Sequence, residues 1–313
     1  MLQQTQVTTV IPYYRRFLQK FPTVRDLATA EESAVLAEWS GLGYYSRAKN
    51  LRRGAQAVVE RWAGELPGSR DELLEVPGIG PYTAGAIASI AFDKPAPIVD
   101  GNVQRVFSRL YGFERPLTSK EAKVFFWDKA EQWVKAAESP RILNQALMEL
   151  GATICIKGTP RCSSCPLQSV CVAEATGRQL ELPVKKPQRE KVDLWWMALI
   201  IESDGKLFLR QIPEGEWWSG LWDFPRLEAS DPKALEREWK KQLRNWDGVR
   251  SAEALGLRLH TVTHHRLHVR PQLVKLESPS FDAPGRWFTP SERDQLPISS
   301  LARKVLSTHP GGL

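Results

Sequence analysis

Long apolar segments are missing from this chain of 313 residues. Its most hydrophobic stretch, residues 195–201, is far shorter than the roughly 20 residues that a membrane-spanning helix needs, so we expect no membrane partner. Residues 1–6 read Met-Leu-Gln-Gln-Thr-Gln and have neither the basic head nor the apolar body of a secretory signal. These absences favour a cytoplasmic location.

Histidine is absent from the first 259 residues, since all five histidines lie between His260 and His309. Chemistry in that part must rest on carboxylates, amides, hydroxyls and thiols. Cysteine is also scarce: the four cysteines all lie between Cys155 and Cys171, which in a chain of this size argues against a disulfide scaffold. The net charge of +7 is small for this length, so nucleic-acid binding would need local patches and backbone amides.

Hydrophobic periodicity divides the chain into two parts. Residues 1–181 show apolar positions three and four apart, separated by Pro and Gly, which predicts a mostly α-helical domain. Residues 182–191 are basic, contain two prolines and predict a linker. Residues 192–313 predict an α+β domain. Its strand-like runs are residues 195–201, 206–210, 257–263 and 268–276, and its helical patterns are residues 232–243 and 292–305.

A glycine-rich turn joins two helical segments in the first part. Residues 76–86 read Val-Pro-Gly-Ile-Gly-Pro-Tyr-Thr-Ala-Gly-Ala, between a short helical segment and an apolar helix. Gly78 and Gly80 permit the backbone angles of a tight hairpin, and the N–H groups at the start of the second helix suit a DNA phosphate. The spacing fits both a DNA-binding helix-hairpin-helix and an ordinary glycine-rich turn.

An acid and an amide follow about twenty residues later, where residues 97–103 read Pro-Ile-Val-Asp-Gly-Asn-Val. Asp100 and Asn102 precede an amphipathic helix at residues 103–111. Such residues are common helix caps, and the position after the hairpin adds a second interpretation, a catalytic carboxylate.

The four cysteines form one compact group, Cys155, Cys162, Cys165 and Cys171, with gaps of 6, 2 and 5 residues. Thiolates this close predict one shared metal centre, and zinc is the usual occupant of four cysteines. The unequal gaps and Pro166 after the third cysteine favour a 4Fe–4S cluster instead.

Together, the hairpin, the Asp100 turn and the cysteine spacing resemble the endonuclease III superfamily of DNA glycosylases. Three further runs are similar to its adenine-excising, MutY-type branch: residues 1–7, 41–48 and 144–151. Residues 215–225 resemble the Nudix-like C-terminal domain of that branch. The resemblance implies a monomeric base excision repair enzyme, acting at the bacterial nucleoid, that hydrolyses the glycosidic bond of adenine opposite 8-oxoguanine or guanine in double-stranded DNA.

The resemblance also implies residue roles. Asp100 would stabilise the oxocarbenium-like sugar and assist water, while Tyr82 and Asn102 would hydrogen-bond within the site. Tyr82 stands where bifunctional glycosylase/lyases carry their Schiff-base lysine, which argues for a monofunctional enzyme. The residues expected to contact DNA are Gln3, Gln4, Tyr44, Gly78, Gly80 and Thr83. Thr263 and His264 would recognise 8-oxoguanine, although a surface strand would also accommodate them.

One family feature is expected outside the printed residues. The glutamate that protonates adenine stands two positions before the family's Met-Leu-Gln-Gln-Thr-Gln run, which here begins at Met1. We expect a start-site difference, and a catalytically impaired lesion-binding form and an endonuclease III-like glycosylase/lyase are the alternatives. In the second domain, residues 232–241 lack the Glu-Glu pair of a Nudix hydrolase, so we expect recognition of the lesion rather than hydrolysis there.

Overall fold

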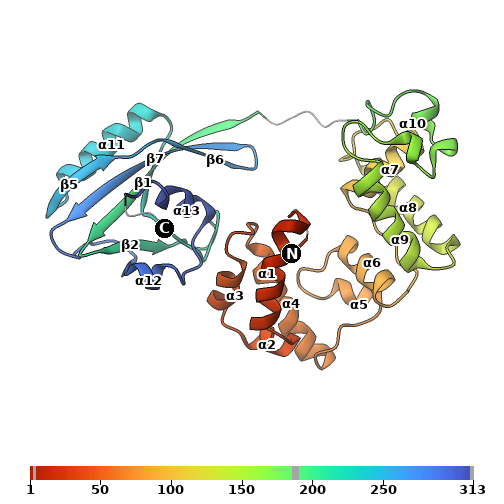
Figure 1. Ribbon diagram of the computed structural model, residues 1–313, viewed down its shortest axis with the longest axis horizontal. Helices are drawn as coiled ribbons and strands as arrows, with labels where there is room; N and C mark the ends of the chain where they lie inside the picture. The colour runs from red at the N-terminus through yellow and green to blue at the C-terminus, as the bar shows by residue number, and fades with distance from the viewer. Residues whose placement is uncertain (3–4, 185–189, 311–313) are drawn as a thin grey trace. The chain divides into compact units, whose positions relative to one another are not determined.

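The computed structural model describes residues 1–2, 5–184 and 190–310. The predicted DNA contacts Gln3 and Gln4, and the middle of the predicted linker, lie outside the described residues. The chain forms two compact units, one made of Met1–Arg52 with Arg189–Leu313 and the other of Arg53–Gln188 (Figure 1). The boundary at residue 52 falls inside a helix, and the domain boundaries given above stay a prediction.

The chain begins with helices whose apolar residues recur at helical spacing. These are α1 (Val7–Lys20), α2 (Val24–Thr29), α3 (Glu32–Trp39) and α4 (Ser46–Trp62). On α1 the buried side chains Val10 and Phe17 are seven residues apart and so share a face. The ring of Phe17 meets that of Trp39 edge to face, with centroids 6.1 Å apart. This contact packs α1 against the end of α3.

The unit Arg53–Gln188 is helical after the end of α4. Its elements are α5 (Arg70–Leu74), α6 (Pro81–Ile90), α7 (Gly101–Leu110), α8 (Lys120–Ala136), α9 (Pro140–Glu149), the π-helical turn η1 (Leu150–Ile154), the short turns η2 (Cys162–Ser164) and η3 (Gln168–Val170), and α10 (Val172–Ala175). Val103, Val106 and Phe107 of α7 are buried against Phe126 of α8. Helix α7 is therefore fixed by the core, and the polar residues at its start are held in place with it.

The C-terminal part is built on one sheet with short strands on its flanks. The strands are β1 (Val192–Ser203), β2 (Lys206–Gln211), β3 (Trp222–Asp223), β4 (Arg226–Ala229), β5 (Val249–Ala254), β6 (Arg258–Val262), β7 (His265–Leu276) and β8 (Arg286–Phe288). Their order is β3-β2-β1-β7-β5, with β4 on β1, β6 on β7 and β8 on β2. The central pair is parallel, and its register runs from Val192 opposite His265 to Glu202 opposite Lys275.

Alternate residues of β1 enter two different cores. Met197, Leu199 and Ile201 pack with Leu235 and Trp239 of α11 (Pro232–Arg244). The intervening residues Ala198 and Ile200 pack in the core that also holds Leu301 and Val305 of α13 (Ser300–Leu306). Since successive strand residues point to opposite faces, this pattern places a helix on each face of the sheet.

The predicted fold class, mostly α-helical residues followed by an α+β domain, is confirmed. Within it, the helix predicted at residues 292–305 is wrong, because α12 (Pro290–Arg293) ends early and α13 begins at Ser300. Pro297 lies between them and cannot donate a helical hydrogen bond. Among the described residues, no helix is both long and apolar enough to cross a membrane.

Candidate functional site

The hairpin between α5 and α6 has the backbone that its glycines predict. Gly78 has a φ of +86°, a conformation that side chains other than glycine rarely adopt, and the Ile79 N–H donates to the Val76 carbonyl at 3.0 Å. Gly80 caps α6 and has no heavy atom within 4 Å of the place a Cβ would take. The start of α6 therefore combines the positive end of a helix dipole with open space beside Gly80.

Asp100 is the N-cap of α7, and its carboxylate is held by three donors. Oδ1 accepts from the backbone N–H groups of Asn102 at 2.9 Å and Val103 at 2.8 Å. Oδ2 accepts from Asn102 Nδ2 at 3.2 Å. The cap interpretation of this turn is thus correct, and the same hydrogen bonds fix the carboxylate rigidly.

Tyr82, on the first turn of α6, lies close enough to this turn to sense its charge. Burial, followed by the negative charge of Asp100, raises the pKa of the Tyr82 hydroxyl above its usual value. The phenol, whose ordinary pKa is about 10, is protonated at neutral pH and can donate a hydrogen bond. The structure thus brings together the three residues predicted as catalytic, Tyr82, Asp100 and Asn102.

Arg105 connects the Asp100 turn with the cysteine loop. Its Nη2 donates to Asn102 Oδ1 at 3.0 Å and to the carbonyl of Gly151 at 2.6 Å. Its Nε donates to the carbonyl of Cys155 at 2.7 Å. Gly151 lies so close that a Cβ there would be 2.8 Å from Asn102 Cβ. A continuous set of hydrogen bonds therefore runs from the Asp100 carboxylate to the first cysteine.

All four cysteines line one pocket and none is in a disulfide. Arg109, which is buried, also lines it: Nη1 donates to Cys155 Sγ at 3.5 Å and to the Ile156 carbonyl at 2.8 Å. Burial, followed by a hydrogen bond with Glu174, raises the pKa of Cys162 to about 11. Among the described residues, no three His, Cys, Asp or Glu side chains have the arrangement of a metal-ion site.

Tyr44 projects from the loop between α3 and α4, in the other unit. It has a φ of +47°, unusual for a residue with a side chain, and 60% of its surface is exposed. Gly41 and Gly43 beside it also have positive φ. An exposed aromatic ring held on a strained backbone suits insertion into a base stack.

Thr263 and His264 form the two-residue turn of the hairpin between β6 and β7. Thr263 is exposed with a φ of +54°, and its Oγ1 lies 3.3 Å from His264 Nδ1. The rings of His264 and His265 are 4.0 Å apart. The turn thus presents a hydroxyl and two imidazoles at one hairpin tip.

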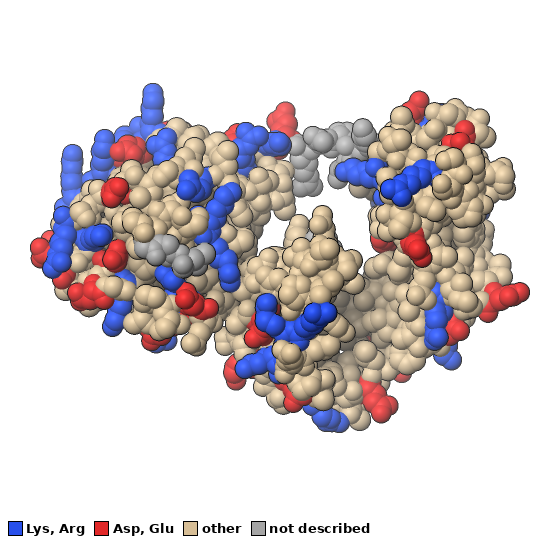
Figure 2. All heavy atoms as spheres, viewed as in Figure 1, with Lys and Arg blue, Asp and Glu red and all other residues tan. Residues whose placement is uncertain are grey.

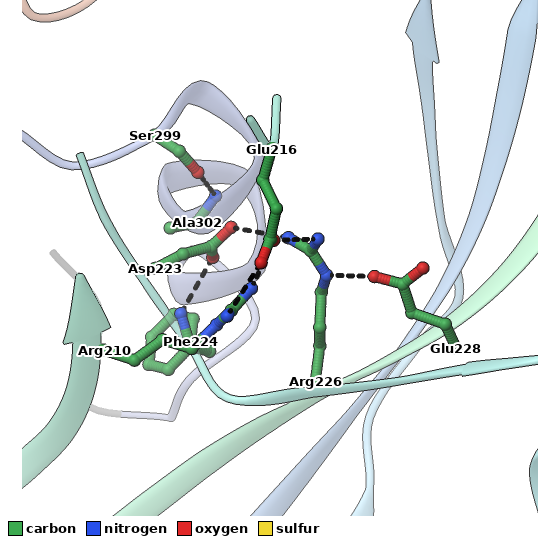
Figure 3. A network of polar contacts seen from close by, with 8 residues as sticks. All are labelled: Arg210, Glu216, Asp223, Phe224, Arg226, Glu228, Ser299 and Ala302. Atoms are coloured by element: carbon green, nitrogen blue, oxygen red, sulfur yellow. Dashed lines mark hydrogen bonds and ion pairs between the residues drawn. The ribbon is translucent and has the colours of Figure 1, made fainter. Parts of the chain in front are cut away.

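Acidic residues near the start of β4 are paired with arginines. Glu216 accepts from Arg210 at 2.9 Å and from Arg226 at 2.7 Å, and Arg226 also donates to Glu228 at 2.6 Å (Figure 3). Hydrogen bonding from Arg210 lowers the pKa of Glu216. The Asp223 carboxylate is buried, and this burial raises its pKa to about 6.

Helix α11 presents a basic outer surface. Figure 2 shows Lys and Arg side chains projecting from the part of the molecule where Figure 1 places α11. The exposed basic residues of this helix are Lys233, Arg237, Lys240, Lys241 and Arg244. Its acids Glu236 and Glu238 are two residues apart and point to different faces, and Glu236 pairs with Lys240 at 3.5 Å.

Sequence reasoning missed the two arginines of α7. Arg105 and Arg109 are four residues apart on a helix whose other buried positions are apolar except for Ser108. That spacing places both side chains on one face of the helix, and this pattern indicates that they contact polar groups of the same neighbouring segment.

Comparisons with known proteins agree with these features. Residues 1–132 match the family described as HhH-GPD superfamily base excision DNA repair protein, and residues 196–308 match the NUDIX domain. The chain is 37% identical to adenine DNA glycosylase of Mus musculus, covering 97% of this chain and 69% of that protein. It is 33% identical to adenine DNA glycosylase of Buchnera aphidicola subsp. Acyrthosiphon pisum, over 88% of this chain and 77% of that protein.

A solved structure extends the similarity to the fold. The structure of a thermostable thymine-DNA glycosylase is 28% identical, with a TM-score of 0.51 over 56% of this chain and 80% of that chain. The curated relatives span nearly the whole chain at more than 30% identity. The chain therefore belongs to the adenine DNA glycosylase family.

Proposed function

We propose that this protein is a monofunctional adenine DNA glycosylase of base excision repair, which hydrolyses the N-glycosidic bond of adenine opposite 8-oxoguanine or guanine. The observation that carries the proposal is the Asp100 carboxylate, which follows the hairpin and α6 and is held by two backbone N–H groups and the Asn102 amide. Family membership supports the same activity.

In the proposed mechanism, the target adenine leaves the base stack, because its glycosidic bond is inaccessible within the duplex. As the bond breaks, positive charge develops on the sugar, and the fixed carboxylate of Asp100 stabilises it without reorganisation. The same carboxylate orients the attacking water, whose hydroxyl joins the sugar while the departing adenine takes up a proton. Tyr82, whose hydroxyl is protonated at neutral pH, would donate a hydrogen bond within the site.

We propose that the four cysteines hold a 4Fe–4S cluster. They line a single pocket as free thiols, and all-thiolate ligation is the usual donor set for such a cluster. The unequal gaps of 6, 2 and 5 residues and Pro166 after the third cysteine favour this cluster over zinc. When bound, the cluster would order the loop between η1 and α10.

DNA contacts are assigned to separate elements. Gly80 and the first turn of α6, with Gly78 and Thr83, would bind a backbone phosphate. Tyr44, with Gln3 and Gln4, would enter the base stack, and Thr263 and His264 would recognise 8-oxoguanine. Glu216 and Glu236 are paired with basic residues, and residues 232–241 have no Glu-Glu pair, which supports recognition rather than metal-dependent hydrolysis in the C-terminal domain. The domain boundaries 1–181 and 192–313 are part of this proposal.

A single-turnover assay tests the proposal with the full-length protein. A duplex carrying adenine opposite 8-oxoguanine should release adenine and leave an abasic site, which hot alkali converts to a strand break. Asp100→Asn should lose roughly a hundredfold or more in rate while still binding the duplex, because the charge is lost and the cap is kept. Asp71→Asn, at an exposed acid of α5, is the matched control and should excise at the wild-type rate.

The same reaction separates the alternatives. A Schiff-base lyase would be trapped covalently on DNA by borohydride, whereas a monofunctional enzyme with Tyr82 at that place would not. Binding of the duplex without adenine release would favour the lesion-binding alternative. Near-normal excision by Asp100→Asn would show that Asp100 is not the catalytic carboxylate.

A further inference from the structure

Arg47, on the first turn of α4, lies between two elements that are proposed to contact DNA. Its Nη1 donates to the carbonyl of Met1 at 3.0 Å, and its Nη2 lies 3.3 Å from Thr5 Oγ1. The same Nη2 lies 3.4 Å from the carbonyl of Leu42 and 3.3 Å from that of Gly43. One guanidinium thus holds both the start of the chain and the loop that carries Tyr44.

Arg47 also contacts the aromatic rings of this region. Its guanidinium carbon lies 5.6 Å from the centroid of the Tyr44 ring and 5.3 Å from that of Trp39. Trp39 reinforces the loop, because its Nε1 donates to the Gly43 carbonyl at 3.1 Å. The cation therefore lies over the ring that is proposed to enter the base stack.

The loop needs such support because its conformation is unfavourable by itself. Tyr44 has a φ of +47°, and 60% of the residue's surface is exposed, so little packing holds it. A left-handed backbone persists only where surrounding contacts determine it. An aromatic ring that is already oriented loses less conformational entropy on insertion than a free one.

We propose that Arg47 is a positioning residue that keeps Tyr44 and its loop ready for insertion beside the lesion pair. The inference rests on the proposed function, since it deepens the role given to Tyr44. Lysine would not replace Arg47, because reaching several carbonyls from a position beside two aromatic rings requires the planar fork of a guanidinium.

Base unstacking gives the direct test. In a duplex with 2-aminopurine next to 8-oxoguanine, insertion of Tyr44 should raise the 2-aminopurine fluorescence. Arg47→Ala and Arg47→Lys should slow this rise and weaken duplex binding by roughly tenfold. Tyr44→Ala should abolish the rise, and adding Arg47→Ala to it should weaken binding little further. Arg52→Ala is the control. Arg52 lies on α4 like Arg47, but it donates to the Ala30 carbonyl at 2.5 Å and not to the Tyr44 loop.

The free protein provides a second measurement that needs no DNA. Amide hydrogen exchange in residues 40–46 should be faster in Arg47→Ala than in wild type or Arg52→Ala. Unchanged exchange, or independent effects of Arg47→Ala and Tyr44→Ala on binding, would overturn the inference. In that case the wild type would still release adenine. If instead the proposed function were wrong, the wild type would release no adenine, while the effect of Arg47→Ala on the Tyr44 loop would still be present.

Discussion

Arg105 and Cys155 are joined by a 2.7 Å hydrogen bond from Nε to the backbone carbonyl, although they are 50 residues apart. The same guanidinium reaches Asn102, which in turn donates to Asp100. The backbone at the first cysteine and the turn that holds the proposed catalytic carboxylate are thus parts of one arrangement.

Replacement of Arg105 by Gln should disturb both ends of this arrangement. A glutamine has one NH₂ group and cannot reach Asn102, Gly151 and Cys155 together, so buried carbonyls lose their donors. We expect adenine excision to fall by roughly tenfold to a hundredfold and iron to be lost faster to a chelator. Single-turnover rates and iron release measure the two effects. Arg141→Gln, at an exposed arginine of α9, should change neither.

The metal content of the cysteine pocket is a direct prediction. Anaerobically purified protein should contain about four iron atoms per chain and absorb broadly near roughly 400 nm. Replacing Cys165 by Ser should reduce the iron content and lower the melting temperature. Stoichiometric zinc without iron would show that the pocket holds a different metal.

Gly151→Ala should impair the site without removing any polar group. The new Cβ would meet Asn102 Cβ at 2.8 Å, so α7 or η1 must shift, at a cost of about 1–3 kcal/mol. We expect a slower excision step and a lower melting temperature. Gly177→Ala is a useful comparison, because its φ of +70° strains the backbone while no heavy atom lies within 4 Å of the new Cβ. An equal loss of activity in both variants would argue against a specific effect on Asn102.

Asp223 should give the C-terminal domain a distinct pH dependence. Its folded pKa is about 6, raised by burial above the ordinary value of 3.8, so between these values the folded state binds more protons than the unfolded state. The contribution of Asp223 to the free energy of unfolding should therefore fall as pH rises from about 4 to 6. The full shift of the Asp223 pKa corresponds to about 3 kcal/mol. Asp223→Asn should remove this dependence in urea unfolding curves. Subtracting the curve of the variant from that of the wild type separates the pH dependence of Asp223 from that of Glu216, whose lowered pKa has the opposite effect on stability.

The sequence predicted those features that depend on local residue type. Asp100 could be recognised as a cap, and the continuous apolar run of residues 195–201 predicted a strand, since both depend on neighbouring residues. Strand β5 (Val249–Ala254) was missed, because it is largely exposed and shows no apolar alternation. Its pairing with β7 is a property of the assembled sheet.

The hydrogen bonds made by the arginines of α7 and α4 could not be predicted from the sequence, because they also depend on the assembled structure. Arg105 and Arg47 have ordinary sequence surroundings, and their partners are 46 to 50 residues away in several cases. Only the folded chain determines which carbonyl a half-buried guanidinium meets. The proposed catalytic turn was predictable, while the residues that hold it and the Tyr44 loop in place were not.

The parallel pairing of β1 with β7 has a consequence for truncated chains. Strand β7 pairs with β1, β5 and β6, and its first residue, His265, comes 73 positions after the first residue of β1, Val192. A premature stop codon before His265 would therefore remove the strand on which the sheet is assembled, rather than trim its edge. We expect such products to leave the apolar residues of β1 uncovered and to be cleared by proteolysis, even when residues 53–188 have been synthesised in full.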